Sequence, residues 1–267
     1  MEGVPRPKKL EYADYIEGTR RVLEQSKSET EPYTVKVAER EFLVLPNVFS
    51  PKYFHDTELF AQNLPVKKDE EVLEIGSGTG AVSIIAAYRG ARKVLAVDIN
   101  PDAVRNTQAN IDLHHMKDRV EVREGNLYEP LQSNERFDMV FWNTPFGLIE
   151  EREISDLEKA VYDPGYKSTE QFLKGAQEHL KEGGRVLIGF STTLGRLDLL
   201  QKLTDEAGLS LRLLYEAESE ETHSVKFENF EAKPGSITQC AAHAARVGEP
   251  LCGVFAVFRA ASGGDVV

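Results

Sequence analysis

Residues 71–87 read EVLEIGSGTGAVSIIAA. The run EVLEI is typical of a buried strand, and the apolar run AVSIIAA is typical of a helix. Between them, Gly76 and Gly78 allow backbone conformations and a close approach that a side chain would block. The N-terminus of the following helix offers free N–H groups to a polar ligand. The stretch therefore predicts a strand, a ligand-binding turn and a helix in succession.

Strands and helices alternate along the rest of the chain. Apolar and β-branched runs predict further strands at 93–99, 119–126, 137–142, 185–191, 209–217 and 251–260. Helices are predicted at 81–90, 101–115, 169–184 and 196–208. Pro101 suits a first helical position, and Gly183 suits the end of a helix. The alternation predicts an α/β fold with a seven-stranded, mostly parallel Rossmann-like sheet and helices on both faces.

The N-terminal residues predict a short extension. Apolar residues recur at helical spacing over 8–26, and two short strands at 33–37 and 41–45 predict a hairpin. We therefore divide the chain into an N-terminal helix and hairpin extension, residues 1–45, and a main domain, residues 46–267.

Three other segments complete the predicted organisation. A helix is predicted over 56–64, with Asp56 as its N-cap. The stretch 218–250 is acidic and then rich in Gly and Ala, which predicts an irregular insertion. Residues 261–267, ASGGDVV, predict a frayed tail.

The charge of the chain argues against a nucleic-acid partner. It carries 32 Lys and Arg residues against 44 Asp and Glu residues, a formal net charge of −12. Binding to a phosphate backbone takes clustered Lys and Arg side chains. We therefore expect a protein, peptide or small-molecule partner, and the sequence does not predict an oligomeric state.

The sequence predicts a cytoplasmic protein without a metal centre. MEGVPRPKKLEYADY at the N-terminus lacks the apolar core of a signal peptide, and no run of about 18 apolar residues predicts a membrane span. Cys240 and Cys252 predict two reduced thiols, because their spacing matches no metal site. The six histidines have no metal-binding spacing either.

An acidic residue follows the glycine turn at an informative distance. Asp98 ends the strand at 93–99, 22 residues after Gly76. A carboxylate at this place can accept hydrogen bonds from both hydroxyls of a ribose. Gly76, Gly78 and Ala81 also fit a loose G-x-G-x-x-G/A pattern, so a nicotinamide dinucleotide is one candidate cofactor.

Four segments together resemble one enzyme family. EVLEIGSGTGAVSIIAA, AVDINPDAVRNTQANI, EGNLYEPL and FDMVFWNTPF occur in this order between residues 46 and 260. They resemble the successive motifs of class I S-adenosylmethionine-dependent methyltransferases. Asn143-Thr144-Pro145-Phe146 is similar to the [Asn/Asp]-Pro-Pro-[Tyr/Phe] motif of enzymes that methylate planar nitrogens, including release-factor glutamine N-methyltransferases. The lead-in NVFSPKYFHDTELF and the hairpin before it resemble the glutamine enzymes too.

The resemblance implies S-adenosyl-L-methionine as cofactor and assigns roles to matching positions. The cofactor's methionine part would be lined by Glu74, Gly76, Ser77, Gly78, Thr79 and Gly80. Asp98 would bind the ribose hydroxyls and Ile99 would pack on the adenine, whose edge Asn126 and Leu127 would meet. Asn143 would lie between cofactor and acceptor.

The chemistry of the NTPF tetrapeptide agrees with these roles. Pro145 ends the strand at 137–142, and ligands bind at the carboxyl ends of strands in open α/β sheets. An amide nitrogen is a poor nucleophile, so two acceptors must orient it: the Asn143 side-chain oxygen and the Thr144 carbonyl. Pro145 would fix the turn, and Phe146 would stack on the planar group. Thr144 stands where proline is usual, and this leaves the acceptor atom open.

Two segments supply candidate substrate contacts. GLIEEREISDLEKAVYDPGYKSTEQF, residues 147–172, is long for a strand–helix connection and is a candidate lid. Its candidate contacts are Tyr162, Asp163 and Tyr166, and the lead-in segment adds Phe54, His55 and Thr57.

These observations predict a methyltransferase that acts on a planar, amide-like nitrogen of a protein, peptide or small molecule. A glutamine side chain is the first candidate acceptor. The short N-terminal part favours a peptide or metabolite acceptor as the second. The alternatives are an NAD-dependent dehydrogenase, a methyltransferase for base amino groups or for small-molecule oxygens, and a scaffold that binds cofactor without activity.

Overall fold

The computed structural model describes residues 12–214, 217–219, 225–231 and 254–259. The predictions made for Cys240, Cys252 and the tail lie outside these residues. The N-terminal and middle elements are α1 (Tyr12–Lys27), β1 (Tyr33–Val37), β2 (Arg40–Val44), α2 (Asp56–Asn63), β3 (Glu71–Ile75), α3 (Ala81–Tyr88), β4 (Lys93–Asp98), α4 (Pro101–Leu113), β5 (Val120–Glu124) and β6 (Phe137–Asn143). They are followed by β7 (Gly147–Ile149), η1 (Glu158–Ala160), β8 (Tyr162–Pro164), α5 (Lys167–Ala176), η2 (Gln177–His179), β9 (Leu180–Phe190), α6 (Leu197–Glu206), β10 (Ala217–Ser219), β11 (Val225–Glu231) and β12 (Val254–Arg259).

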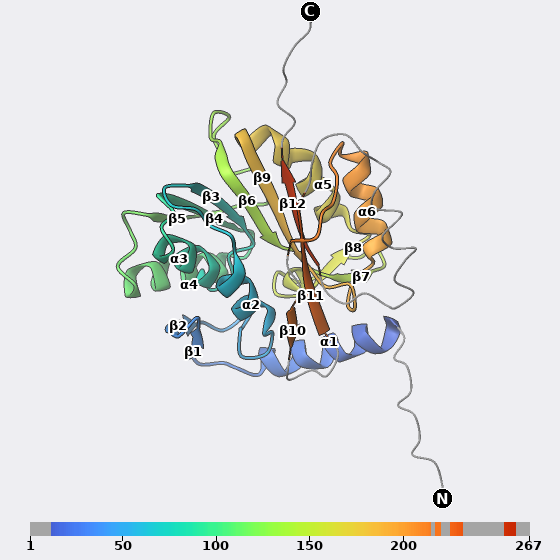
Figure 1. Ribbon diagram of the computed structural model, residues 1–267. Helices are drawn as coiled ribbons and strands as arrows, with labels where there is room; N and C mark the ends of the chain where they lie inside the picture. Colours follow the sequence, from blue (N-terminus) through green and yellow to red (C-terminus); the bar gives the residue numbers. More distant parts are fainter. Residues whose placement is uncertain (1–11, 215–216, 220–224, 232–253, 260–267) are drawn as a thin grey trace, which may run out of the picture.

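The central sheet has the strand order β10-β11-β12-β9-β6-β3-β4-β5 (Figure 1). Five neighbouring strands, from β9 to β5, run parallel, and β12 runs antiparallel to β9. This confirms the mostly parallel α/β sheet, but the number of strands was wrong: the sheet has eight strands and not the predicted seven, because β10 and β11 extend it beyond β12. From the central strand β3, the chain builds the sheet toward β5 and then turns to the other side with β6. Ligands bind where the strand order reverses in this way, which here is the carboxyl edge of β3 and β6.

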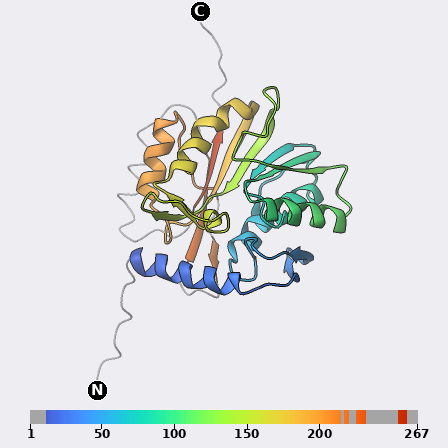
Figure 2. The same cartoon turned by 180° about the vertical axis from the view of Figure 1, so that it is seen from behind.

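Helices cover both faces of the sheet (Figures 1 and 2). Alternate residues along each strand point to opposite faces, so the sheet contributes to two separate hydrophobic clusters. On one face, Ile75 and Trp142 pack with Phe172 of α5 and with α6. On the other face, Val72 and Phe141 pack with α2, α3 and α4. This alternation explains why the strands read as continuous apolar runs.

The N-terminal helix and hairpin form where the sequence predicted them, and both pack on the rest of the chain. The hairpin β1–β2 lies against α4, because the N–H of Leu43 donates to Oδ1 of Asn110 at 2.8 Å and that of Leu45 to Oδ1 of Asn106 at 2.7 Å. Both asparagine side chains also donate to the carbonyl of Leu43. The division at residues 45 and 46 stays a prediction.

The strand predicted at 209–217 is wrong. Leu213 makes only an isolated bridge, and the next strand, β10, begins at Ala217. Leu209 and Leu211 are buried, and they pack in the cluster of α5 and α6. The side chains of Leu209 and Leu211 therefore fill the core. The strand that pairs with the edge of β9 is β12 instead. The insertion predicted at 218–250 is not wholly irregular, because β11 and part of β10 belong to the sheet.

Two predicted helix boundaries are also wrong. Gly183 does not end a helix: α5 ends at Ala176, and Gly183 lies within β9 with a φ of 71°. The pairing of β6 with β9 shifts register at this place, and such irregularities favour a glycine of positive φ. Asp56 is the first residue of α2 and not its N-cap, which is His55.

Candidate active site

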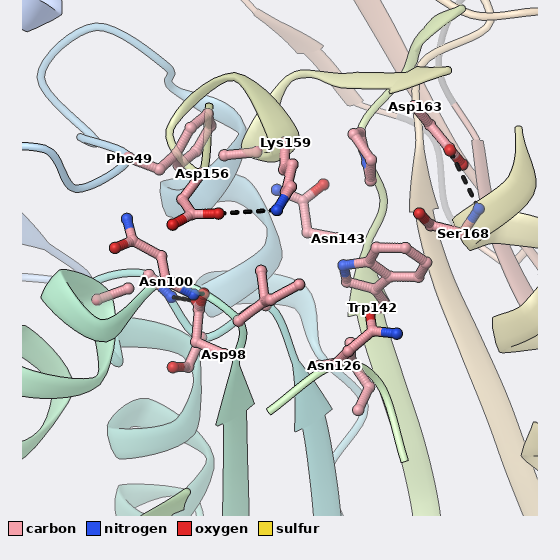
Figure 3. Close-up of a pocket in the computed structure, with 18 of the residues that line it drawn as sticks. Phe49, Asp98, Asn100, Asn126, Trp142, Asn143, Asp156, Lys159, Asp163 and Ser168 are labelled. Carbon is pink, nitrogen blue, oxygen red and sulfur yellow. Dashed lines mark hydrogen bonds and ion pairs between the residues drawn. The ribbon is translucent and has the colours of Figure 1, made fainter. Parts of the chain in front are cut away.

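A cavity of about 560 Å³ opens at the carboxyl ends of β3, β4 and β6 (Figure 3). The predicted site residues that line it are Thr57, Glu74, Gly76, Ser77, Gly78, Thr79, Asp98, Ile99, Asn126, Leu127, Asn143, Pro145, Tyr162 and Asp163. The predicted residues that do not line it are Phe54, His55, Gly80, Thr144, Phe146 and Tyr166. The structure thus brings the glycine turn, Asp98 and Asn143 to one cavity, although they are distant in sequence.

The glycine turn packs so closely on its neighbours that side chains at Gly76 and Gly80 would clash. Gly76 has a φ of 67°, and a Cβ at this residue would lie 2.9 Å from Nε1 of Trp142. The N–H groups of Gly76 and Ser77 both donate to the carbonyl of Val97, which fixes the turn on β4. Gly80 lies behind the cavity, where a Cβ would lie 2.8 Å from Cγ2 of Thr107.

Asp98 is held at the end of β4 with both carboxylate oxygens bound. One oxygen accepts from the N–H of Gly78 at 2.8 Å, and the other from the N–H of Asn100 at 2.9 Å. Burial raises the pKa of Asp98 to about 6, and the two N–H groups oppose this rise. Each oxygen keeps a further lone pair, so the carboxylate can still accept from the hydroxyls of a ribose.

Glu74 is the second buried carboxyl of the cavity. Its side chain is only 3% exposed and accepts a hydrogen bond from the hydroxyl of Ser83. Burial raises its pKa to about 8. A cationic group bound nearby would favour the ionised form of Glu74, because its positive charge would attract the carboxylate.

The side of the cavity beyond Asp98 suits a flat apolar group. Ile99 is 37% exposed, which is unusual for an isoleucine that follows a buried strand. Asn126 and Leu127 also line the cavity, and Leu127 has a φ of 49°. Asn100 was not predicted, although it lines the cavity and also caps α4 by accepting from the N–H of Asp102.

The four residues of the NTPF tetrapeptide have different surroundings. Asn143 and Pro145 line the cavity. Thr144 turns away from it, because its N–H and its hydroxyl both donate to the carbonyl of Gly189. The ring of Phe146 packs edge-on against Phe190, with ring centroids 5.8 Å apart. The structure therefore does not place Phe146 for stacking in the cavity.

The side chain of Asn143 has one bound end and one free end. Its Nδ2 donates to Oδ2 of Asp56 at 2.8 Å. Its Oδ1 is buried and has no hydrogen-bond partner among the residues that the structure describes. Buried acceptors of this kind are rare, and an unmet acceptor at a cavity wall is a natural partner for a ligand N–H.

Of the predicted substrate contacts, Thr57, Tyr162 and Asp163 line the cavity. Tyr166 does not line it, so the substrate contact predicted for Tyr166 is wrong. It is 1% exposed, and its hydroxyl donates to the carbonyl of Phe146 at 2.7 Å and accepts from the N–H of Arg196. Its hydroxyl thus braces the turn after β6. The carboxylate of Asp163 accepts from Ser168 and Thr169 at the start of α5.

Two aromatic rings flank the lead-in segment. Phe54 does not line the cavity but stacks on Phe49, with ring centroids 4.4 Å apart. Phe49 does line the cavity, and the sequence did not identify it. Trp142 belongs both to the core and to the cavity wall.

Residues 147–166, here called the roof segment, supply much of the remaining wall. The segment contains β7, η1 and β8, and α1 runs along it (Figure 1). The hydroxyl of Tyr12 donates a hydrogen bond to the carbonyl of Leu148 and accepts one from its N–H. Lys159 of the segment forms an ion pair with Asp156 at 2.8 Å beside Asn143 (Figure 3). These charges were not predicted as site residues, because on the sequence they resemble an ordinary solvated loop.

One cavity thus brings together the glycine turn, the carboxylate of Asp98 and the side-chain amide of Asn143. Residues 39–209 match the family model described as Methyltransferase small domain, and the chain belongs to this family. Membership in this family confirms the resemblance that the motifs indicated. It also confirms S-adenosyl-L-methionine as the cofactor. The residues present fit that cofactor, because the glycine turn lines the cavity and the carboxylate of Asp98 can still accept from ribose hydroxyls.

Curated relatives share the same part of the chain. A Methanocaldococcus jannaschii protein, named provisionally as a protein N5-glutamine methyltransferase, is 33% identical over 162 residues, which are 59% of this chain and 79% of that protein. The release factor glutamine methyltransferase of Aquifex aeolicus is 33% identical over 180 residues, which are 61% of this chain and 62% of that enzyme. This chain thus spans about three fifths of the release factor enzyme.

Solved structures share the fold. A T. thermophilus 16S rRNA N2 G1207 methyltransferase in complex with AdoMet and guanosine has a TM-score of 0.52 and 21% identity, covering 70% of this chain and 48% of that one. A M. jannaschii tRNA m1G37 methyltransferase has a TM-score of 0.51 and 19% identity, covering 71% and 52%. At these identities the likeness establishes the fold alone.

The buried carboxyl of Asp98 predicts a pH-dependent affinity for S-adenosylhomocysteine. Ribose hydroxyls favour the ionised carboxylate, so affinity should rise as the pH rises through about 6. Between pH 7 and pH 5 we expect a loss of about tenfold, measured by isothermal titration calorimetry. Asp98→Asn should bind more weakly and should change affinity less over this range than the wild type. A wild-type affinity that is constant from pH 5 to 7 would remove Asp98 from the ribose.

Proposed function

We propose that the protein transfers the methyl group of S-adenosylmethionine to a planar, amide-like nitrogen, and that a glutamine side chain is the first acceptor to test. One observation carries this proposal: the side chain of Asn143 presents a buried, unpartnered oxygen at the wall of the cavity that holds the glycine turn and Asp98. The names of the glutamine methyltransferase relatives support it.

The cofactor would be held by the residues that the motifs assign. Asp98 would accept from the ribose, and Ile99 and Leu127 would enclose the adenine. The turn from Gly76 to Thr79 would hold the methionine part, because it lines the cavity. Bound in this way, S-adenosylmethionine supplies an electrophilic methyl group on a positively charged sulfur.

The chain's own task is then to orient the acceptor. The Oδ1 of Asn143 would accept one N–H of the acceptor amide. The side chain of Thr144 turns away from the cavity, and its backbone carbonyl, between the lining residues Asn143 and Pro145, would accept the other N–H. Both Thr144 and Pro145 are suited to this, since Thr144 is anchored to Gly189 and the φ of proline is fixed. Two such contacts would point the nitrogen lone pair at the methyl carbon, and the proton released on transfer would leave to water.

This grip recognises two hydrogens on one flat nitrogen, which suits a primary amide. A hydroxyl acceptor has only one hydrogen and would leave one of the two oxygens unmet. That difference favours nitrogen over oxygen as the acceptor atom. The cytoplasmic location and the extension at residues 1–45 stay predictions from the sequence.

The decisive experiment is a transfer assay with labelled S-adenosylmethionine. We expect label on the side-chain amide nitrogen of glutamine in a panel of glutamine-containing proteins and peptides, located by fragmentation in a mass spectrometer. Matched peptides with glutamate in place of glutamine should not be labelled. Label that appears only on nucleosides, or only on hydroxyl groups, would overturn the proposal.

A thermal-shift measurement distinguishes the methyltransferase from the NAD-dependent dehydrogenase that the sequence left as an alternative. S-adenosylhomocysteine should raise the midpoint of unfolding, because a ligand that binds only the native state stabilises it. NAD and NADH should leave the midpoint unchanged. The opposite pattern would favour a dehydrogenase.

A further inference from the structure

We propose that Asp56 is a positioning residue that holds the side-chain amide of Asn143 with its oxygen toward the acceptor. This inference rests on the proposed function, because the orientation matters only if Asn143 grips an acceptor N–H. The motif of the tetrapeptide ends at Phe146, and Asp56 lies 87 residues before Asn143 in the chain.

Asp56 is placed by the start of helix α2. Its side chain is 9% exposed. Oδ1 accepts from the N–H of Thr57 at 3.1 Å, and Oδ2 accepts from Nδ2 of Asn143 at 2.8 Å. One carboxylate thus joins the first turn of α2 to the last residue of β6.

The chemistry of a carboxylate selects one orientation of the neighbouring amide. An ionised carboxylate only accepts hydrogen bonds, whereas an amide has a donor end and an acceptor end. Burial raises the pKa of Asp56, and the hydrogen bond from Asn143 opposes this rise. In its ionised form, Asp56 can bind the NH₂ end of Asn143 and cannot bind the oxygen. With the NH₂ end held, Oδ1 of Asn143, a residue that lines the cavity, is left without a partner among the described residues.

The reverse orientation would fail twice. It would bring Oδ1 of Asn143 against a carboxylate oxygen, which places two acceptors in contact. It would also turn the NH₂ group toward an acceptor amide that offers only its own N–H groups in this direction. A half turn of one side chain would therefore remove the grip on the acceptor without moving the backbone.

Asp56 could instead serve only to begin α2 through its bond to Thr57. The two roles are separable, because a purely local role does not depend on which group stands at residue 143. Exchanging the carboxylate and the amide between the two positions therefore tests the contact itself.

The test compares Asp56→Asn, Asn143→Asp and the double variant for kcat and KM in transfer, with S-adenosylhomocysteine affinity as a check on folding. Asn143→Asp places two carboxylates in contact, and kcat should fall by about a hundredfold. In the double variant, the amide introduced at position 56 can donate to one oxygen of the carboxylate introduced at position 143 and leave the other oxygen free. We expect it to recover at least about tenfold in kcat over Asn143→Asp, with KM changed less.

The control is Glu58→Gln, which alters another carboxylate of the same helix. Glu58 accepts from the N–H of Ala38, away from Asn143, and this variant should keep kcat within about twofold. A double variant that binds S-adenosylhomocysteine but is no more active than Asn143→Asp would overturn the role of Asp56.

A second measurement does not depend on the acceptor. The side-chain NH₂ signal of Asn143 in an NMR spectrum of labelled protein should shift when Asp56 becomes alanine and should stay unchanged in Glu58→Gln. An unchanged signal in Asp56→Ala would overturn the positioning role, even if amide transfer is found. A shifted signal in a protein that labels no amide would instead leave the contact standing and overturn the proposed function.

Discussion

Replacing Asn143 by alanine is expected to reduce methyl transfer by about a hundredfold or more, the loss seen when one preorganised group is removed from a transition state. The acceptor would lose the Oδ1 contact that points its lone pair at the methyl carbon. The affinity for S-adenosylhomocysteine should change by less than about threefold, because Asp98 and the glycine turn remain. Single-turnover transfer and calorimetric binding measure the two effects separately.

This substitution also leaves Asp56 without its partner, so the stability of the variant has to be measured. We expect a loss of about 1–3 kcal/mol in the free energy of unfolding. Asn134→Ala is the matched control, since Asn134 is an exposed asparagine outside the cavity. Near-normal turnover by a folded Asn143→Ala protein would show that its side chain does not hold the acceptor.

The parts of the fold that depend on local pattern were predictable. Residues 71–87 give a strand, a turn and a helix, because each signal lies within a few residues of the next. The strand predicted at 209–217 failed because its apolar pattern suits a core loop as well as a strand. Only the arrangement of the sheet decides between them, and that arrangement brings in β12 from residue 254 onward.

The same distinction applies to the site. The cofactor residues around Gly76 and Asp98 belong to short motifs, so the sequence located them. Which way a side chain points was not predictable, because it depends on distant partners. Phe146 faces Phe190, and the hydroxyl of Tyr166 is engaged by the carbonyl of Phe146 and by Arg196.

Partners that are distant in sequence also explain what the motifs missed. Asp56 lies at the start of a helix and also contacts Asn143. The sequence pattern predicts only the helix start. Lys159 and Asp156 have the composition of a solvated surface. They reach the cavity because α1 packs on the roof segment, where the hydroxyl of Tyr162 donates to the carbonyl of Ile16.

The second large effect concerns the opposite end of the sheet. Arg185 of β9 is 8% exposed, and its guanidinium binds both carboxylate oxygens of Glu70, at 2.6 and 2.8 Å. It also donates to the carbonyl of Pro65 at 2.7 Å. Arg185→Met should lower the free energy of unfolding by about 3 kcal/mol or more, because it leaves a largely buried carboxylate without its cation. Urea denaturation followed by circular dichroism measures this loss.

Two further variants separate the buried pair from an ordinary ion pair. Arg196 and Asp198 form an exposed pair, with side chains 48% and 61% exposed, so Arg196→Met should cost less than about 1 kcal/mol. Replacing both Arg185 and Glu70 by methionine should recover part of the loss, because no unpaired charge is left behind. Equal losses for Arg185→Met and Arg196→Met would show that burial does not strengthen this contact. A recovery in the double variant would show that the cost lies in the stranded carboxylate.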